Sequence, residues 1–259
     1  MEPRIYKLYF LIVFTILHLN LSGCSVKEIS SSVELNKPIN KVSNTQVVTP
    51  SRIENRNEAT LYFPKGYNKG YNPKIAYPII YVFRHDADAN ASVHFWRDLS
   101  DKHQFIIWAS KGYKNDMENL ALKRLMDSTK FYVERISDRI LIDKRRVYFT
   151  GLSGGGSFSE ALLLTYPHLA SGIIVNTGRI WDQFYNNAQK SDRLLTLTFI
   201  KSKPQIILLA SPADFRYEEM KRDKLFFQKL GCKVQWIEFE GGHTFAPKQI
   251  YDSVLKEVI

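Results

Sequence analysis

The chain has 259 residues, of which 44% are hydrophobic and 24% charged, and its formal net charge is +10. This length suits one domain with short appendages, and this composition excludes a largely disordered protein. No stretch interleaves basic and aromatic residues, so we interpret the positive charge as a basic surface and expect no nucleic-acid partner. The two cysteines, Cys24 and Cys232, are too few for a disulfide framework.

The first 23 residues have the pattern of a signal peptide. Arg4 and Lys7 precede an apolar run over 8–21 that is too short for a transmembrane helix. The run ends in the tetrapeptide LSGC at positions 21–24, which resembles the lipobox of bacterial lipoproteins. The resemblance implies cleavage before Cys24, lipid attachment to that cysteine and therefore a membrane partner. The alternative is an ordinary secretory signal followed by a chance cysteine.

Residues 24–57 are predicted to be the lipidated cysteine and a flexible tether. Ser, Asn, Lys, Val and Thr are frequent there, and neither a helical nor a strand period is visible. We therefore expect the protein to be lipid-anchored in the bacterial cell envelope, facing outside the cytoplasm. In Gram-negative lipoproteins an Asp after the lipidated cysteine favours the inner membrane, so Ser25 favours the outer membrane there.

Residues 58–259 are predicted to form a single α/β domain. Short apolar runs without alternation are typical of strands buried on both faces, and they occur at 77–84, 104–109, 146–150, 172–175 and 205–210. A further strand is expected at 233–239. Apolar positions spaced by three and four residues predict helices over 122–140, 158–166, 217–230 and 250–258. This alternation predicts a doubly wound, mostly parallel central sheet with helices on both faces.

A candidate nucleophile follows the predicted strand at 146–150. Gly151-Leu152-Ser153-Gly154-Gly155 lies between that strand and an apolar helix, which is the context of a nucleophile elbow. Small neighbours permit the tight turn that would expose the Ser153 hydroxyl. The Gly154 amide lies at the start of the helix, where it can stabilise an oxyanion. A turn that is merely glycine-rich is the alternative interpretation.

A serine nucleophile needs a base and a carboxylate that orients it. His243 follows the predicted strand at 233–239 within a glycine turn, and Asp214 follows the strand at 205–210. Loops at the carboxyl ends of parallel strands are where active groups gather. We predict a catalytic set of Ser153, Asp214 and His243, with Asp182 as the rival carboxylate. The remaining histidines are expected in the leader, on the surface or at helix ends: His18, His94, His103 and His168.

The segment from Ile142 to Ser153 resembles the I-D-x-x-R-V-Y-x-x-G-x-S segment of secreted esterases. These are α/β-hydrolases of the polyhydroxybutyrate depolymerase-like, feruloyl esterase-like and esterase D-like types. The resemblance extends over about residues 76–243 and implies an α/β-hydrolase fold. It also implies that Ser153 is the nucleophile, Asp214 the acid and His243 the base.

One segment departs from that family. After its early strand the family has His-Gly and further small residues, which hold a second oxyanion amide, whereas this chain has the sequence RHDADA over 84–89. We expect the amide of Asp86 or Ala87 to replace it and His85 to brace the loop. A carboxylate close to an oxyanion is unfavourable unless it points away.

The connection over 178–203 is long for this fold, and its first part contains the aromatic residues Trp181, Phe184 and Tyr185. We expect it to form a wall or lid of an acyl pocket, with an ordinary surface helix as the alternative.

The favoured function is hydrolysis of a small-molecule or polymeric carboxylic ester through an acyl-enzyme, and the pattern requires no metal and no organic cofactor. A serine peptidase or an acyltransferase could use the same triad. A third reading is an inactive surface lipoprotein that keeps the hydrolase fold for binding.

Overall fold

A computed structural model describes residues 49–67, 76–190 and 192–259. The predicted leader, Cys24 and the tether as far as residue 48 lie outside the described residues. The described residues all belong to one compact unit, from Gln46 to Ile259, which contains every strand and both apolar cores discussed below. A unit with its own cores can fold without the residues that precede it.

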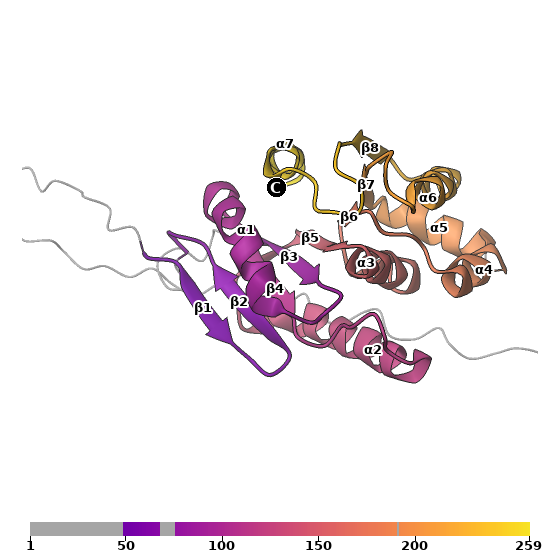
Figure 1. Cartoon of the computed structure of the whole chain (residues 1–259). Helices are drawn as coiled ribbons and strands as arrows, with labels where there is room; N and C mark the ends of the chain where they lie inside the picture. Colours follow the sequence, from indigo (N-terminus) through magenta and orange to yellow (C-terminus); the bar gives the residue numbers. More distant parts are fainter. Residues whose placement is uncertain (1–48, 68–75, 191) are drawn as a thin grey trace, which may run out of the picture. The chain divides into compact units, whose positions relative to one another are not determined.

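The unit is built on one eight-stranded sheet with the strand order β1-β2-β4-β3-β5-β6-β7-β8 (Figure 1). Six neighbouring strands, from β4 to β8 in that order, are parallel, while β2 is antiparallel to both of its neighbours, β1 and β4. The strands are β1 Arg52–Asn55, β2 Ala59–Phe63, β3 Tyr77–Phe83, β4 Ile106–Ser110, β5 Ile142–Leu152, β6 Gly172–Asn176, β7 Gln205–Ala210 and β8 Val234–Glu238.

Helices cover both faces of this sheet. The helices α1 and α7 pack on one face, and α2, α3, α5 and α6 contribute to the core on the other face. The helices are α1 Ala89–His103, α2 Asn119–Arg135, α3 Gly154–Thr165, α4 Asp182–Lys190, α5 Asp192–Ser202, α6 Tyr217–Lys229 and α7 Lys248–Val258. None of the helices formed by described residues is long and apolar enough to cross a membrane.

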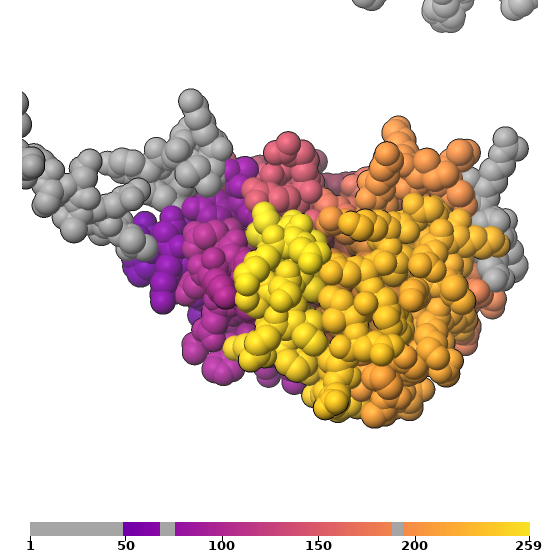
Figure 2. Space-filling model, turned by 90° about the horizontal axis from the view of Figure 1, so that it is seen from above, coloured from indigo at the N-terminus to yellow at the C-terminus, as the bar shows by residue number. Residues whose placement is uncertain are grey.

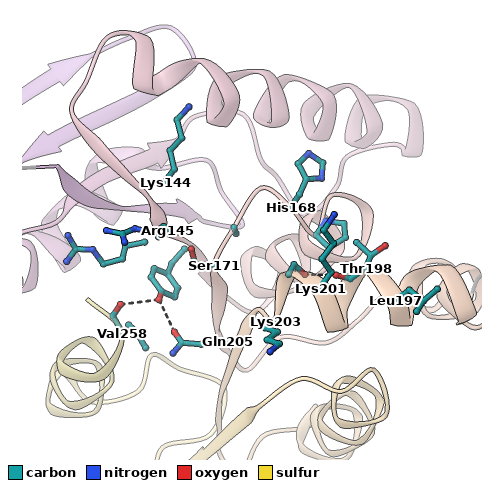
Figure 3. Close-up of a pocket in the computed structure, with 15 residues that line it drawn as sticks. Lys144, Arg145, His168, Ser171, Leu197, Thr198, Lys201, Lys203, Gln205 and Val258 are labelled. Atoms are coloured by element: carbon teal, nitrogen blue, oxygen red, sulfur yellow. Dashed lines mark hydrogen bonds between the residues drawn. The ribbon is translucent and has the colours of Figure 1, made fainter. Parts of the chain in front are cut away.

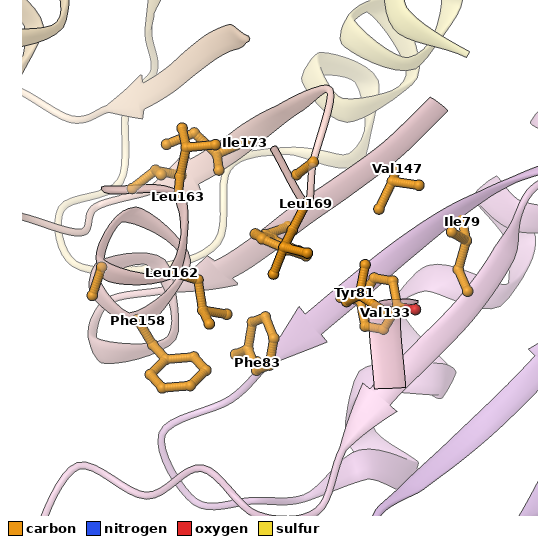
Figure 4. Packing of buried hydrophobic residues seen from close by; sticks show 14 of the residues in the cluster. Ile79, Tyr81, Phe83, Val133, Val147, Phe158, Leu162, Leu163, Leu169 and Ile173 are labelled. Carbon is orange, nitrogen blue, oxygen red and sulfur yellow. The ribbon is translucent and has the colours of Figure 1, made fainter. Parts of the chain in front are cut away.

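The sheet has an apolar core on each side, because its parallel strands bury both of their faces. Figure 4 shows part of the larger core, in which Phe83 of β3 meets Phe158 of α3 with ring centroids 4.8 Å apart. On the other side, Trp96 of α1 packs against Tyr251 of α7 at 4.9 Å. The space-filling view shows the C-terminal segment in yellow beside the magenta segment that contains α1 (Figure 2). The predicted α/β-hydrolase architecture of the sheet and its layers is confirmed.

Two boundaries differ from the prediction. The strand β1, at Arg52–Asn55, lies inside the segment predicted as tether, so the ordered domain begins before residue 58. Its pairing with β2 is antiparallel and its side chains are largely exposed, and such an edge strand carries little apolar signal. The strand β5 begins at Ile142, earlier than expected, because a register shift opposite β3 accommodates a charged segment within it.

Candidate active site

Ser153 occupies the turn between β5 and α3. Its φ of 56° and ψ of −121° place it in a backbone region that residues with a side chain rarely adopt, so the turn is strained. A Cβ atom on Gly155 would lie 2.0 Å from the carbonyl oxygen of Phe83, and one on Gly151 would lie 2.4 Å from the backbone of Gly155. The glycines on either side of the serine are therefore required for this turn to pass so close to β3.

His243 lies between the serine and a carboxylate. Its Nε2 atom is 2.8 Å from the Ser153 hydroxyl oxygen, and its Nδ1 atom is 2.7 Å from Oδ2 of Asp214. The Asp214 side chain is completely buried, whereas the His243 side chain is 29% exposed. A neutral imidazole held in this way donates from Nδ1 to the carboxylate and can accept a proton at Nε2. The structure therefore brings the three predicted residues together in one hydrogen-bonded chain.

The rival carboxylate has other partners. Asp182 Oδ1 lies 3.3 Å from Arg179 and 3.5 Å from Arg222, at the start of α4. The described histidines other than His243 are also engaged elsewhere or exposed; for example, His103 contacts Asp252 at 2.8 Å. Asp214 is thus the carboxylate that orients His243.

The loop that carries His243 is fixed by Asn176, a fully buried residue at the end of β6. Its side-chain oxygen accepts hydrogen bonds from the amide of Ala246 and from the Tyr251 hydroxyl, both at 2.6 Å. Its side-chain nitrogen donates to the Thr244 carbonyl at 2.8 Å, and its own carbonyl accepts from the Ser153 amide at 2.9 Å. One side chain therefore holds the histidine loop against the strand next to the nucleophile. Sequence analysis missed it, because a lone Asn at a strand end carries no motif.

A second tie joins the aspartate and histidine loops. The Ser211 hydroxyl accepts a hydrogen bond from the Gly242 amide at 2.9 Å. The Asp214 amide donates to the Ser211 carbonyl, and Oδ1 of Asp214 accepts from the Arg216 amide at 2.7 Å. Oδ1 of Asp214 is thus bound to the Arg216 amide, and Oδ2 is left for His243. These two contacts fix the side-chain rotamer of Asp214.

The two predictions for the second oxyanion donor have different outcomes. The Ala87 amide donates to the Arg84 carbonyl at 3.1 Å within a turn, and Ala87 itself has φ 60°. Ala87 is therefore not available as an oxyanion donor, because the turn after β3 consumes its N–H group. The Asp86 amide takes part in none of the backbone hydrogen bonds found outside helices and strands among the described residues. Asp86 remains the candidate, together with the Gly154 amide at the start of α3.

The Asp86 carboxylate is compensated within its own loop. It accepts hydrogen bonds from Arg84 Nε at 2.8 Å and from the Asp88 amide at 3.1 Å. Burial alone would raise the pKa of Asp86, but these two partners hold that pKa below its ordinary value. Arg84 thus compensates the negative charge of Asp86, which would otherwise destabilise an oxyanion nearby.

A side chain that the sequence analysis did not single out lies directly against Gly154. A Cβ atom on Gly154 would be 1.8 Å from Oδ1 of Asn115 and 2.7 Å from the Tyr113 hydroxyl. The Tyr113 hydroxyl donates to Oδ1 of Asn115 at 3.0 Å. Burial raises the pKa of Tyr113 well above its ordinary value, so this hydroxyl stays protonated and remains a donor. The carboxamide of Asn115 therefore has a fixed position beside the predicted oxyanion amide.

A cavity of about 400 Å³ opens beside Gly154. Trp181 forms part of its wall, and most of the lining is polar or charged. The lining residues are Tyr113, Lys114, Asn115, Met117, Asn119, Leu122, Gly154, Trp181, Asp182, Gln183 and Arg216.

Two of the three aromatic residues predicted for the pocket wall lie elsewhere. Phe184 contacts Trp181 at 5.8 Å but lines a neighbouring cavity of about 550 Å³. Tyr185 packs against Phe226 of α6 at 5.0 Å and beneath the Arg222 guanidinium at 4.6 Å. Asp182 and Gln183 of α4 line the cavity beside Trp181, while the next two side chains, Phe184 and Tyr185, point to other surfaces.

A buried charge cluster lies beneath the site. Glu160 of α3 is 1% exposed, and neither of its carboxylate oxygens has a hydrogen-bond partner. Asp223 of α6 is fully buried and accepts hydrogen bonds from the Ile180 amide at 2.7 Å and from Arg222 at 3.0 Å. Burial, and next the negative charge of Asp223, raise the pKa of Glu160 well above its ordinary value. The cluster ties the loop after β6 to the helices on that face.

Other reactive groups are few among the described residues. Cys232 is a free, buried thiol, and burial raises its pKa to about 12, so it is a poor nucleophile. The described part of the chain contains no group of three or more His, Cys, Asp or Glu side chains placed to hold a metal ion.

Solved structures of low sequence identity share this architecture. A fluorophosphonate-binding serine hydrolase of Staphylococcus aureus, FphF, is 11% identical, with 80% of this chain and 96% of that chain covered and a TM-score of 0.57. The Francisella virulence factor BioJ is 13% identical, with coverages of 82% and 85% and a TM-score of 0.61. A ferulic acid esterase is 16% identical, with coverages of 77% and 89% and a TM-score of 0.58.

The chain has an α/β-hydrolase fold. At these identities the likeness concerns the fold alone, so the chemistry has to be argued from the site. The sequence matches no protein-family model and no curated protein sequence.

Proposed function

We propose that the protein is a serine hydrolase that cleaves carboxylic esters through an acyl-enzyme on Ser153. The observation that carries the proposal is the hydrogen-bonded chain from Ser153 through His243 to the buried Asp214. The three residues lie in loops that follow the carboxyl ends of parallel strands. Ser153 itself occupies a strained turn beside the N-terminus of α3. The names of the solved relatives agree with a hydrolase but do not carry the argument.

In the first half of the reaction the Ser153 oxygen attacks the ester carbonyl carbon while His243 Nε2 takes the hydroxyl proton. The carbonyl oxygen becomes an oxyanion, which the amides of Gly154 and Asp86 stabilise. When the carbon–oxygen bond to the alcohol breaks, His243 returns the proton to the leaving oxygen. The products are a free alcohol and an acyl group on Ser153.

In the second half a water molecule replaces the alcohol. His243 takes a proton from the water as its oxygen attacks the acyl carbon, and then gives the proton back to the Ser153 oxygen as the acid leaves. Asp214 stays ionised throughout and stabilises the imidazolium that forms twice in each cycle.

The polar cavity beside Gly154 favours a short or polar acyl group over a long alkyl chain. A methylene group that moves from water into an apolar pocket contributes about 0.8 kcal/mol, which is about a fourfold gain in kcat/KM. Lys114, Asn115 and Arg216 line this cavity, so an acyl chain that entered it would meet polar and charged groups. We therefore expect no gain for each added methylene.

A substrate panel tests this proposal. Acetyl, butyryl and decanoyl p-nitrophenyl esters are compared with the corresponding anilides, with and without an added alcohol. We expect ester hydrolysis, flat or falling kcat/KM from acetyl to decanoyl, and loss of turnover in Ser153→Ala but not in the exposed control Ser253→Ala. Faster anilide cleavage would indicate a peptidase, and preferential transfer to the alcohol would indicate an acyltransferase. A fourfold rise for each methylene would contradict the polar acyl site.

We also propose that the hydrolase domain is lipid-anchored through Cys24 in the cell envelope, facing outside the cytoplasm. Support for this comes from the basic, apolar leader and the LSGC motif at 21–24. Cys24→Ala is expected to leave an uncleaved or released protein that takes up no labelled palmitate. Equal palmitate incorporation into Cys24→Ala and wild type would contradict the anchor.

A further inference from the structure

A large cavity among the described residues lies far from Ser153. It measures about 950 Å³, and its lining comes from the start of β5, the loop before β6 and the end of α5 (Figure 3). These segments lie at the amino ends of the parallel strands, whereas the catalytic loops follow their carboxyl ends. We refer to Lys144, Arg145, Arg146, His168, Leu197, Lys201 and Lys203, all of which line this cavity, as the basic edge.

The positive charge of the basic edge is only partly balanced. Asp143 binds both arginines, with Arg145 Nε at 3.2 Å and Arg146 Nε at 3.0 Å. No ion pair given by the described residues involves Lys144, Lys201 or Lys203, and all three are exposed. A surface with several uncompensated cations attracts a polyanion.

Exposed apolar side chains lie on α5, the helix that carries Lys201, and one of them, Leu197, lines the same cavity. Leu194, Leu197 and Ile200 of α5 are 73%, 56% and 50% exposed, and they precede Lys201 and Lys203 on the same helix and the residue after it. A basic surface with exposed leucine and isoleucine is the combination that binds at a lipid interface, where the cations meet headgroups and the apolar groups enter the acyl boundary. A soluble polyanion would offer nothing to the apolar groups.

The chain also enters the domain on this side. The Thr49 carbonyl accepts from the Gly66 amide at 2.7 Å, the Gly66 carbonyl accepts from the Tyr77 hydroxyl at 3.3 Å, and the Tyr77 amide donates to the Leu141 carbonyl at 3.0 Å. Tyr77 pairs with Ile142, two residues before Lys144. The first described residues are therefore linked to the amino end of β5, which is the end of the sheet that carries the basic edge.

We propose that the basic edge docks on an anionic phospholipid surface, so that the site around Ser153 faces away from the membrane. The cations would bind lipid phosphates, while Leu194 and Leu197 would enter the interface. This docking would orient a domain that the predicted lipid on Cys24 keeps near the same membrane. The proposal does not depend on the ester chemistry, and it also holds for a chain without the lipid.

Vesicle flotation tests the docking with the chain from Ser25 to Ile259, which contains the whole compact unit and lacks the lipidated residue. Vesicles of phosphatidylcholine alone are compared with vesicles that contain 30% phosphatidylglycerol. Each lysine near an anionic surface contributes about a fivefold gain in affinity, so the triple variant Lys144→Gln/Lys201→Gln/Lys203→Gln should bind about 100-fold more weakly. A matched triple variant on other surfaces, Lys123→Gln/Lys221→Gln/Lys224→Gln, removes the same charge and should bind within about fivefold of wild type.

The double variant Leu194→Ser/Leu197→Ser separates a lipid surface from a soluble polyanion. It should weaken vesicle binding at least threefold and leave binding to soluble heparin unchanged, while circular dichroism and ester turnover report that the domain is folded. Heparin binding without vesicle binding would overturn the proposal in favour of an acidic polysaccharide. Equal binding to both vesicle types, or equal losses in the two lysine variants, would overturn it as well.

Discussion

Ser153, His243 and Asp214 act as a unit in the proposed reaction, because each proton transfer requires all three. Ser153→Ala and His243→Ala are each expected to lower kcat by about 10⁴–10⁶, and the double variant is expected to be hardly worse than either single variant. Asp214→Asn should cost about 10⁴, because an amide favours the wrong imidazole tautomer. Steady-state kinetics on one ester measure all four variants. Additive losses in the double variant would contradict a shared mechanism.

Asn176 is a positioning residue, since it holds the His243 loop without touching the reacting atoms. Asn176→Ala leaves the Ala246 amide and the Tyr251 hydroxyl without their acceptor, which should lower the free energy of unfolding by about 2–4 kcal/mol. It should also lower kcat more than it changes KM, because His243 loses its fixed position. Urea denaturation and kinetics measure the two effects.

Tyr251→Phe is the matched control for Asn176→Ala. It removes one hydrogen bond to Asn176 but leaves the bonds from that side chain to the histidine loop in place. A loss of about 1 kcal/mol with nearly unchanged kcat is expected. If both variants lowered kcat equally, the effect of Asn176 would be one of stability alone.

At the scale of single elements, the nucleophile elbow depends on the close approach of α3 to β3. Gly155→Ala would place a Cβ atom 2.0 Å from the Phe83 backbone oxygen, and a backbone atom cannot easily move away. We expect a loss of about 3 kcal/mol and misplacement of Ser153. Gly112→Ala is the control, because its Cβ atom would meet only the tip of the Leu125 side chain. Equal thermal unfolding of the two variants would contradict this account of the turn.

The elements differed in how well their sequences predicted them. The strands β3, β6 and β7 were predicted within one or two residues, because they are buried on both faces and carry unbroken apolar runs. The edge strand β1 was missed, since its exposed side chains resemble those of a linker. The motif around Ser153 and the glycine turn at His243 predicted the placement of the triad, because their constraints are local.

The rest of the site could not be predicted because it depends on tertiary placement. Asn115 reaches Gly154 only through the loop after β4, and nothing near it in sequence marks this contact. Tyr185 has the composition expected of a pocket wall, but the orientation of α4 directs it to α6. The Ala87 amide is a reasonable oxyanion donor by sequence, but the turn after β3 engages it in a hydrogen bond to the Arg84 carbonyl.

At the scale of the whole molecule, the buried Glu160 gives stability a pH dependence. Because folding raises its pKa, the folded state favours the protonated carboxyl, and the stability that this group contributes is fully present below about pH 4.3. That contribution is lost as pH rises towards the higher pKa of the folded state. Glu160→Gln cannot titrate at this position. The difference in free energy of unfolding between this variant and wild type should therefore shift in favour of the variant as pH rises from 4.5 to 7.5. Urea titrations at several pH values that gave parallel curves would contradict this.

The fold positions its two candidate surfaces at opposite edges of one sheet. The catalytic loops follow the carboxyl ends of β5, β7 and β8, and the basic edge lies at the amino ends of β5, β6 and β7. Both could therefore be occupied at the same time, with substrate approaching from the side opposite the lipid surface. The variants described for each surface are accordingly expected to be independent, since distant sites without shared partners are additive.

The central claim is that Ser153 is a nucleophile activated by His243, and covalent labelling tests it before any substrate is known. The wild-type chain is treated with a fluorophosphonate, digested and analysed by mass spectrometry beside Ser153→Ala and His243→Ala. We predict one adduct, on Ser153, absent in Ser153→Ala and formed far more slowly in His243→Ala. An adduct on another serine, or a folded wild-type chain that forms none, would contradict the account.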